Sequence, residues 1–438
     1  MAKKHIYLTA AVAAIGLALG GCSSGGGAND ASNTIDGKPS GEITVLTQRT
    51  DIVNTTFKKY AADFEKAYPD VTVKFEAIKD YEGQVKTRLN TKSYGDVLLI
   101  PGTVSPNQLS TFFEPLGTTD KLAATYRFVN EQAFDGKGYG VAITGNAQGI
   151  VYNKKVWTAA GITALPTTPA EFIDDLKAIK DKTDAIPLYT NYKDGWPLTQ
   201  WEYNRGIFGS EDATNDLISD PSPWDDGKYQ NVTDGILFDA VAAKLTEPDP
   251  TTTDWESSKG LLGGGKVGTM VLGSWAITQM KDAAVAAGGS ADDIGYMPYP
   301  VQVDGAYYTT IGGDYKNAIS KYSQHKAAAW AWVKWFAAKS NYSYNEGGLS
   351  PLVDGKDADV YAQLQKDGTK FIEVKVPEGK KSTWELAEIK ASEVDLNGPV
   401  YKQKLIDIAR GAADGTKKSY FAELNKAWGQ AVSDVTGG

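Results

Sequence analysis

The stretch GLLGGGKVGTMVLGSW, residues 260–275, decides how the chain is interpreted. Its glycines and Lys266 match most of the phosphate-binding pattern GxxxxGK[ST], in which a hydroxyl after the lysine holds magnesium. Val267 stands at that position, so the metal ligand is absent. A phosphate-binding loop also follows a strand and opens a helix, whereas here a strand-like run, 267–272, follows the glycines. We therefore interpret the stretch as a turn followed by a buried strand.

The three residues that end this stretch, Gly273, Ser274 and Trp275, are candidates for a binding site. Open α/β sheets bind ligands at the carboxyl ends of their strands, where these residues are expected. Gly273 allows close backbone approach, Ser274 can cap the helix that follows, and Trp275 presents a flat aromatic face.

The first hundred residues after position 41 predict one α/β lobe. Residues 41–51 and 71–78 alternate as strands, and 96–100 is a short, wholly apolar strand typical of a parallel sheet. Between them, helical spacing of apolar residues predicts helices over 54–68 and within 84–92. This β-α-β-α-β order favours a sheet with ligands at its carboxyl edge.

The rest of the chain predicts a second lobe after the segment 134–157. A capping pattern around Thr168 and Glu171 opens a helix that reaches about Lys180. Further helices are expected over 276–287 and within 325–339. The tail from 401 to 432 is predicted to be helical, with one glycine-rich break at 411–415.

The N-terminus has the composition of a secretory signal, with Lys3 and Lys4 before an apolar run. The sequence LGGC at 19–22 resembles a bacterial lipobox, which implies a signal peptide 1–21 and lipid on Cys22. Cys22 is the only cysteine in 438 residues. The alternative is an ordinary signal with an incidental cysteine. The small, polar stretch that follows predicts a flexible tether over 22–41.

Composition excludes several function classes. Removal of residues 1–21 takes away two lysines and no acid, which changes the formal charge from −9 to −11 and argues against nucleic acid as a partner. His325 is then the only histidine, expected in a solvated or capping role at a helix start. Histidine-based catalytic triads and zinc sites of the usual ligand sets are excluded, and no cofactor or metal is expected.

Taken in order, several segments resemble the extracellular solute-binding proteins of ABC importers, in the carbohydrate-binding branch that includes maltose-binding protein. The resemblance runs from about Glu42 to the C-terminus. Many relatives carry a proline just before the aspartate of YGDV and another where Ala142 stands, and these differences bear on the ligand. The matching segments are FEKAYPDVTVKFE, YGDVLLIPG, FDGKGYGVAITGNAQGIVYNKKVWTAAGI, GGGKVGTMVLGSW, IGYMPYP and NEGGLSPLV.

The resemblance implies a type II periplasmic-binding-protein-like fold, in which two α/β lobes joined by three crossings close on a ligand by hinge motion. The crossings map to about 139–146, 306–314 and 345–352. The N-terminal lobe would comprise 42–140 plus 313–346, and the C-terminal lobe 141–312 plus 347–438. All three crossings contain glycines, namely Gly140, Gly145, Gly312, Gly313, Gly347 and Gly348.

A sugar has an apolar ring face and a rim of hydroxyls, so its site needs aromatic platforms and paired hydrogen-bonding side chains. Trp275 is the first candidate platform, and Trp201 and Trp224 follow. Trp196, Trp255 and Trp384 are weaker candidates. Core packing is expected for the remaining tryptophans, which are Trp157, Trp428 and at least two of Trp330, Trp332 and Trp335.

Polar candidates come from the ends of strands and from the crossings. Each could instead be a surface or capping residue, and about half are expected to touch ligand. Asp96 matches a family carboxylate that contacts hydroxyls. The full set of polar candidates is Gln48, Arg49, Asp51, Asp96, Asn146, Glu202, Ser274 and Asp314.

The resulting functional hypothesis is a monomeric, non-catalytic receptor of an ABC transporter. It would capture a carbohydrate, in particular an oligosaccharide, and deliver it to the permease. The lipid on Cys22 would hold it at the outer face of the cell membrane. The alternatives are a surface-tethered glycoside hydrolase or lyase that uses two carboxylates, and a receptor for a non-sugar solute.

Overall fold

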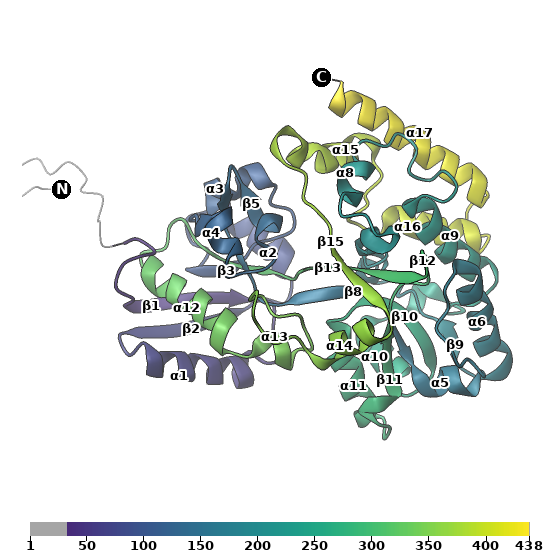
Figure 1. Cartoon of the computed structure of the whole chain (residues 1–438), viewed down its shortest axis with the longest axis horizontal. Coiled ribbons are helices and arrows are strands. Elements are labelled where there is room, and N and C mark those ends of the chain that lie inside the picture. Colours follow the sequence, from purple (N-terminus) through teal and green to yellow (C-terminus); the bar gives the residue numbers. More distant parts are fainter. Residues whose placement is uncertain (1–32, 438) are drawn as a thin grey trace, which may run out of the picture.

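The computed structural model describes residues 33–437 of the chain. The predicted signal peptide, Cys22 and the first part of the tether lie outside these residues. Two separate β-sheets, each covered by helices, organise the described chain into two lobes (Figure 1). The predicted two-lobed α/β fold is confirmed.

The N-terminal lobe contains a five-stranded sheet in the order β2-β1-β3-β14-β7. β1 pairs in parallel with both β2 and β3, as the β-α-β-α-β pattern predicted, while β14 is antiparallel to β3 and β7. The strands are β1 (Gly41–Thr47), β2 (Val71–Ala77), β3 (Val97–Leu99), β7 (Val141–Ala142) and β14 (Lys316–Ile319). A small sheet of β4 (Gly117–Thr118), β5 (Ala133–Phe134) and β6 (Lys137–Gly138) is added to this lobe.

The C-terminal lobe contains a seven-stranded sheet in the order β12-β13-β8-β10-β9, with β11 paired to β8 and β15 to β13. The predicted strand at 267–272 is β10, which is buried along its whole length. The strands are β8 (Gly145–Asn153), β9 (Ile186–Leu188), β10 (Val267–Gly273), β11 (Ile294–Met297), β12 (Gln302–Val303), β13 (Ala306–Gly313) and β15 (Thr369–Glu373).

Helices cover both sheets. The predicted helices over 54–68, up to Lys180, over 276–287, within 325–339 and over 401–432 are found close to their predicted bounds. The helix predicted within 84–92 begins earlier, at Tyr81, and the remaining helices were not predicted. Thr168 caps α6 by accepting a hydrogen bond from the backbone N–H of Glu171, as expected. The N-terminal lobe holds a π-helical turn (Val53–Phe57), α1 (Lys58–Ala67), α2 (Tyr81–Arg88), α3 (Leu109–Phe112), α4 (Thr119–Ala123), α12 (Lys326–Lys339) and α13 (Tyr342–Asn345). The C-terminal lobe holds α5 (Lys154–Ala159), α6 (Pro169–Lys182), α7 (Trp196–Thr199), α8 (Ala213–Leu217), α9 (Tyr229–Ala242), α10 (Trp255–Gly263), α11 (Ala276–Ala286), α14 (Asp359–Lys366), α15 (Trp384–Ser392), α16 (Val400–Ala409) and α17 (Lys417–Thr436).

Each lobe has its own hydrophobic core. Trp330 and Trp332 are buried in the first, and Trp157 and Trp428 in the second, so the predicted structural role of these tryptophans is confirmed. His325 precedes α12 but forms no side-chain cap. Its imidazole instead packs against Gly41, where an added Cβ would lie 2.4 Å from Nδ1. Of the two roles expected for His325, solvated or capping, the capping role is therefore wrong, and the side chain is half-buried.

The chain passes between the lobes at three places, from β7 to β8, from β13 to β14, and from α13 to α14. The first and third passages are joined by two backbone hydrogen bonds, in which Gly145 and Leu349 each donate to the other's carbonyl over 2.7 and 2.8 Å. Gly348 is required there because a Cβ would lie 1.8 Å from the Thr144 hydroxyl oxygen. The passages therefore form one compact connection on one side of the molecule.

Candidate functional site

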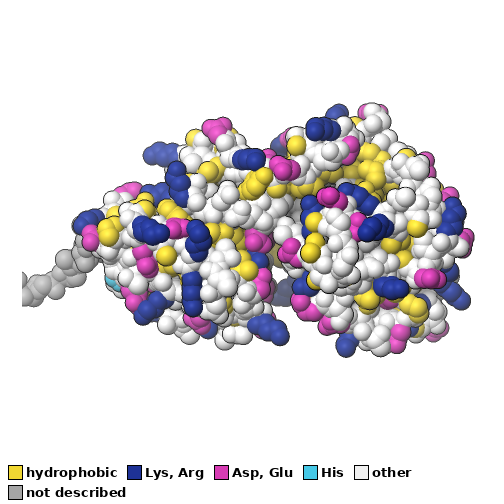
Figure 2. Space-filling model, turned by 90° about the horizontal axis from the view of Figure 1, so that it is seen from below, with side chains coloured by type: hydrophobic (Ala, Val, Ile, Leu, Met, Phe, Trp, Pro, Cys, Tyr) yellow, Lys and Arg dark blue, Asp and Glu magenta, His cyan; other side chains and the backbone are white. Residues whose placement is uncertain are grey.

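A gap separates the two lobes on the side opposite their connection (Figure 2). We infer that the loop after β1 borders it from the N-terminal lobe, and the residues after β9 and β10 from the C-terminal lobe, because the strands end there. These are carboxyl ends of parallel strand pairs, β1 with β3 and β10 with β9. The gap is thus the place where an α/β sheet binds ligands.

Three tryptophans meet at the end of β10. The ring centroids of Trp196 and Trp255 are 4.9 Å apart, those of Trp255 and Trp275 5.6 Å, and those of Trp196 and Trp275 5.7 Å. The Trp196 side of this cluster remains accessible, since that residue is 38% exposed. A surface of this kind can stack on the C–H face of a sugar ring, because aromatic faces are apolar and electron-rich. We call Trp196, Trp255 and Trp275 the tryptophan cluster.

Hydrogen-bonding groups surround the Trp275 ring. Its indole N–H donates to the Gln200 side-chain oxygen over 3.3 Å. The side chain of Gln148 lies against Gly273, and its carbonyl oxygen is buried with no hydrogen-bond partner among residues 33–437. Buried polar atoms normally have partners. Gln148 therefore leaves an unpartnered polar atom beside the ring.

A second group of polar side chains faces the gap from both lobes. Tyr203 of the C-terminal lobe is 44% exposed. Desolvation raises the pKa of Tyr203, and the negative charge of Glu82, which lies on the other lobe, adds to the rise. Desolvation also raises the pKa of Glu82, whose carboxylate accepts a hydrogen bond from the backbone N–H of Gly102. Glu82 therefore acts electrostatically on Tyr203, although the two residues lie on different lobes.

Arg49 connects the loop after β1 to the third passage between the lobes. Its guanidinium donates to both oxygens of Asp51, over 2.9 and 2.8 Å, and to Glu346 over 2.6 Å. It also donates to the Tyr342 hydroxyl over 3.0 Å. The hydrogen bond from Arg49 is the main cause of the lowered pKa of Asp51. Asp314, at the second passage, contributes to the raised pKa of Tyr342 and so belongs to the same neighbourhood.

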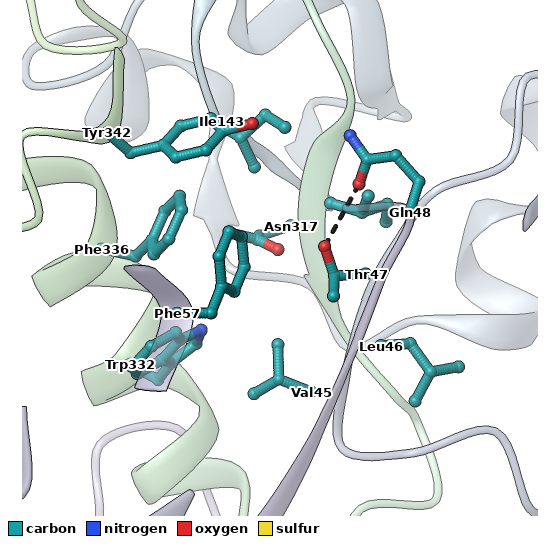
Figure 3. Close-up of a pocket in the computed structure, with 11 residues that line it drawn as sticks. Val45, Leu46, Thr47, Gln48, Phe57, Ile143, Asn317, Trp332, Phe336 and Tyr342 are labelled. Atoms are coloured by element: carbon teal, nitrogen blue, oxygen red, sulfur yellow. Dashed lines mark hydrogen bonds between the residues drawn. The ribbon is translucent and has the colours of Figure 1, made fainter. Parts of the chain in front are cut away.

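Gln48 lies over a small cavity inside the N-terminal lobe (Figure 3). The aromatic rings of Tyr342, Phe336, Phe57 and Trp332 line one side, and Thr47 and Gln48 lie on the other. The volume is about 10 Å³, which is the space of a single water molecule. This cavity is too small for a sugar ring, so the candidate site is the gap and not the cavity.

Trp201 and Trp224 are wrong as candidate platforms. Each is 2% exposed and belongs to the core of the C-terminal lobe. Trp201 packs edge-on against Tyr299. The indole N–H of Trp224 donates to Asp234 over 2.8 Å. Both rings are too deeply packed for either face to reach a ligand.

Glu202 and Ser274 are also buried, at 1% and 0% exposure. Glu202 is paired with Arg205 over 2.8 Å and with Lys402 over 3.6 Å. The Ser274 hydroxyl accepts from the backbone N–H of Ala147 and does not cap α11. Their burial keeps both side chains away from a ligand, so the expectation that they contact it is wrong.

Asp96 and Asn146 lie away from the open part of the gap. Asp96 is at the amino end of β3, at the sheet edge opposite Gln48, where it accepts from the Thr44 backbone N–H and the Ser323 hydroxyl. The expectation that Asp96 contacts ligand is therefore wrong. Asn146 is buried near the second passage, opposite Gly312 in the sheet. Because Asn146 is buried there, we assign it to the connection between the lobes and not to ligand contact.

Sequence reasoning ranked Trp196 and Trp255 too low and did not consider Tyr203. One local signal could have ranked Trp196 higher among the candidate platforms. It follows the strand β9 after a polar loop that contains glycine. Trp255 follows Asp254, which caps α10. Nothing in the local sequence of Tyr203 distinguishes it.

Within the described residues, no group of three or more His, Cys, Asp or Glu side chains is arranged to hold a metal ion. None of the helices in residues 33–437 combines the length and apolarity of a membrane span.

Comparison with known proteins identifies relatives of the whole fold. Residues 50–342 match the family model described as bacterial extracellular solute-binding protein. A solved binding protein of an ABC transporter from Bifidobacterium animalis subsp. lactis, in complex with mannobiose, is 37% identical with a TM-score of 0.83, covering 90% of this chain and 95% of that chain. A manno-oligosaccharide-specific solute-binding protein from the same organism, in complex with mannotriose, is 36% identical with the same TM-score and coverage. The multiple sugar-binding protein of Streptococcus mutans is 26% identical over 72% of this chain and 76% of its own length.

Proposed function

Because this chain belongs to the bacterial extracellular solute-binding protein family, we propose that it captures a carbohydrate in the gap between its lobes and delivers it to an ABC permease. The tryptophan cluster is the observation that carries this proposal. It places stacking surface at the carboxyl end of a parallel strand pair, beside the unpartnered oxygen of Gln148. Apolar faces next to hydroxyl partners are what a sugar requires.

The carbohydrate class that we propose is a short oligosaccharide built from mannose. Two solved relatives that share more than a third of their residues with this chain hold mannobiose and mannotriose. Short oligosaccharides also suit the candidate contacts, because the tryptophan cluster and the exposed Tyr203 together offer more than one aromatic surface. The proposed contacts are Trp196, Trp255, Trp275, Tyr203, Gln148, Gln200, Gln48 and Asp314, with Arg49 and Asp51 ordering the loop beside them.

We further propose that the protein is not an enzyme. A glycoside hydrolase needs one carboxyl group with a raised pKa as general acid, and a second carboxylate beside the scissile bond. Asp51 and Glu346 are both paired with Arg49. That pairing lowers the pKa of Asp51, which opposes a role as general acid. Glu82 has a raised pKa, but its carboxylate is held by the backbone N–H of Gly102, and the sugar incubation described below tests it directly.

We also propose that the protein is attached to the membrane by a lipid, and we propose bounds for its two lobes. The LGGC sequence supports a lipid on Cys22 that holds the folded body at the outer face of the membrane. The lobe assignment of 42–140 plus 313–346, and 141–312 plus 347–438, stays a proposal, except that residues 141–142 form β7 and join the N-terminal sheet. Delivery to a permease would then need only rotation of one lobe toward the other.

Titration calorimetry with mannobiose, mannotriose and maltotriose tests the ligand class. We expect the mannose oligosaccharides to bind and maltotriose to bind at least about tenfold more weakly, a difference of about 1.4 kcal/mol. The same sugars, incubated overnight with the protein, should be recovered at their original length. Tighter binding of maltotriose would overturn the mannose assignment, and shortened products would favour the hydrolase.

A further inference from the structure

A segment of the C-terminal lobe reaches across to the N-terminal lobe. Between β15 and α15 the chain forms a 3-10 turn, η7 (Gly379–Thr383). η7 contacts another 3-10 turn, η2 (Pro106–Gln108), with Cα atoms within 8 Å, although the two turns belong to different lobes. Figure 1 shows this region at the top of the molecule, where the chain before α15 extends toward α3.

Both turns are attached to residues of the candidate site. On the C-terminal side, Glu385 follows η7 and pairs with Arg205 over 2.6 Å, which ties the turn to the segment that carries Tyr203. On the N-terminal side, η2 follows the loop of Gly102, whose N–H donates to Glu82. The η7–η2 contact therefore lies just beyond Tyr203 and Glu82.

The tryptophan cluster lies on the C-terminal lobe, at the end of β10. Trp255 begins α10 and Trp275 precedes α11, and both helices lie at the bottom of the C-terminal lobe in Figure 1. Figure 2, which is drawn from below, shows the gap open at this end. The gap is thus open in the view from below, and η7 and η2 meet across it at the top of Figure 1.

We propose that η7 closes one end of the gap and makes the protein a receptor for the terminal units of a carbohydrate chain. This inference rests on the proposed function. A sugar stacked on the tryptophan cluster can extend out of the open end, but its other terminus meets η7 and η2. A built-in steric barrier of this kind gives specificity by excluding ligands that fit everywhere else.

End-modified mannotriose tests the barrier. One preparation carries a short polyethylene glycol chain at the reducing end, and another carries it on the non-reducing terminal unit. We expect the intact protein to tolerate one modification and to lose about tenfold or more in affinity with the other. Deletion of residues 379–382 should restore binding of the rejected ligand and leave unmodified mannotriose unchanged. Equal affinity of the intact protein for both modified sugars would overturn the proposal, as would rejection that survives the deletion.

Chemical crosslinking tests the contact between η7 and η2 without any sugar. It also tests the proposal if the variant that lacks residues 379–382 does not fold. In a Cys22→Ser background, Asn107→Cys with Lys381→Cys places one thiol on each turn, and a short bis-maleimide should join them rapidly. Lys59→Cys with Lys381→Cys is the control, because Lys59 is on α1. Equal crosslinking of both pairs would overturn the closed end. If the first pair alone crosslinks and no mannose oligosaccharide binds, the proposed ligand is wrong and the closed end stands.

Discussion

The indole of Trp275 lies over the backbone of Gly273. A Cβ added to Gly273 would lie 2.6 Å from two atoms of the ring, which is closer than real Cβ contacts allow. The glycine is therefore what permits the ring to fold back beside Gln148 and toward Trp196. This relationship places the tryptophan cluster at the end of β10.

Gly273→Ala is expected to weaken carbohydrate binding by about tenfold, equivalent to about 1.4 kcal/mol. The added methyl group displaces the Trp275 ring from its position in the cluster. Gly260→Ala is the matched control, because no other atom lies within 4 Å of its added Cβ. Calorimetric titration with mannotriose measures both variants. Unchanged affinity for Gly273→Ala would mean that the ring position does not determine binding.

Trp275→Ala is expected to weaken binding by roughly 30- to 1,000-fold, the usual range for truncation of a central aromatic contact. Its effect on the unfolding free energy should be small, since the ring is only half-buried. Trp224→Ala is the opposite case, because its buried ring should cost about 3–5 kcal/mol of stability. Calorimetry and denaturant melts on both variants separate the two roles. A large loss of stability with normal affinity in Trp275→Ala would make it a core residue.

The stability of the wild-type protein is expected to fall as the pH rises through about 7, because of Glu388. Its carboxyl is fully buried in α15, and neither oxygen has a hydrogen-bond partner within residues 33–437. Desolvation, with a further contribution from Glu385, raises its pKa to about 7. The folded state thus holds a proton that the unfolded state releases at lower pH. The stabilisation from this proton is complete below the ordinary glutamate pKa and is lost as the pH rises through about 7.

Glu388→Gln should remove this pH dependence and make the protein more stable than wild type at pH 8, by roughly 1–3 kcal/mol. Urea melts between pH 4 and 8 measure the effect. Glu378→Gln, at an exposed position of the same segment, should leave the wild-type profile unchanged. A pH profile of Glu388→Gln parallel to that of wild type would show that the pKa of Glu388 is the same in the folded and unfolded states.

Saturating mannotriose is expected to make the protein more compact in solution X-ray scattering, because the lobes rotate about their three connections. The ion pair of Lys316 with Glu131, which also accepts from the Gly313 N–H over 2.9 Å, holds the second connection in place. Trp275→Ala at the same sugar concentration is the control and should not compact. An unchanged wild-type profile at saturation would count against closure of the lobes.

Cys22→Ala is expected to release the protein from membranes or leave an unprocessed precursor, while the folded body keeps its melting temperature. The reason is that lipid attachment requires the thiol of this residue, which is the only cysteine in the chain. Membrane fractionation and mass spectrometry of the wild-type N-terminus measure the effect. If the variant fractionates with membranes as the wild type does, and no lipid is found on wild-type Cys22, the N-terminus is an ordinary signal peptide.

Local sequence predicted the elements well, because the side chains that face a core recur with the period of the helix or strand that carries them. The capped start of α6, the buried β10 and the break between α16 and α17 were all evident from neighbouring residues. Trp275 was identified for the same reason, since its position follows from the strand before it.

Membership of the tryptophan cluster was decided only by the tertiary structure. Trp201 and Trp224 occur in polar, loop-like sequence and are nevertheless buried, because helices from the C-terminal part of the chain pack over them. Trp196 and Trp255 meet Trp275 because β9, α10 and β10 are adjacent in space. Periodicity reports which face of an element is apolar, but the burial of a loop residue depends on segments far away in the sequence. The sequence alone therefore determined the two-lobed fold and one residue of the cluster, and long-range packing determined its two partners.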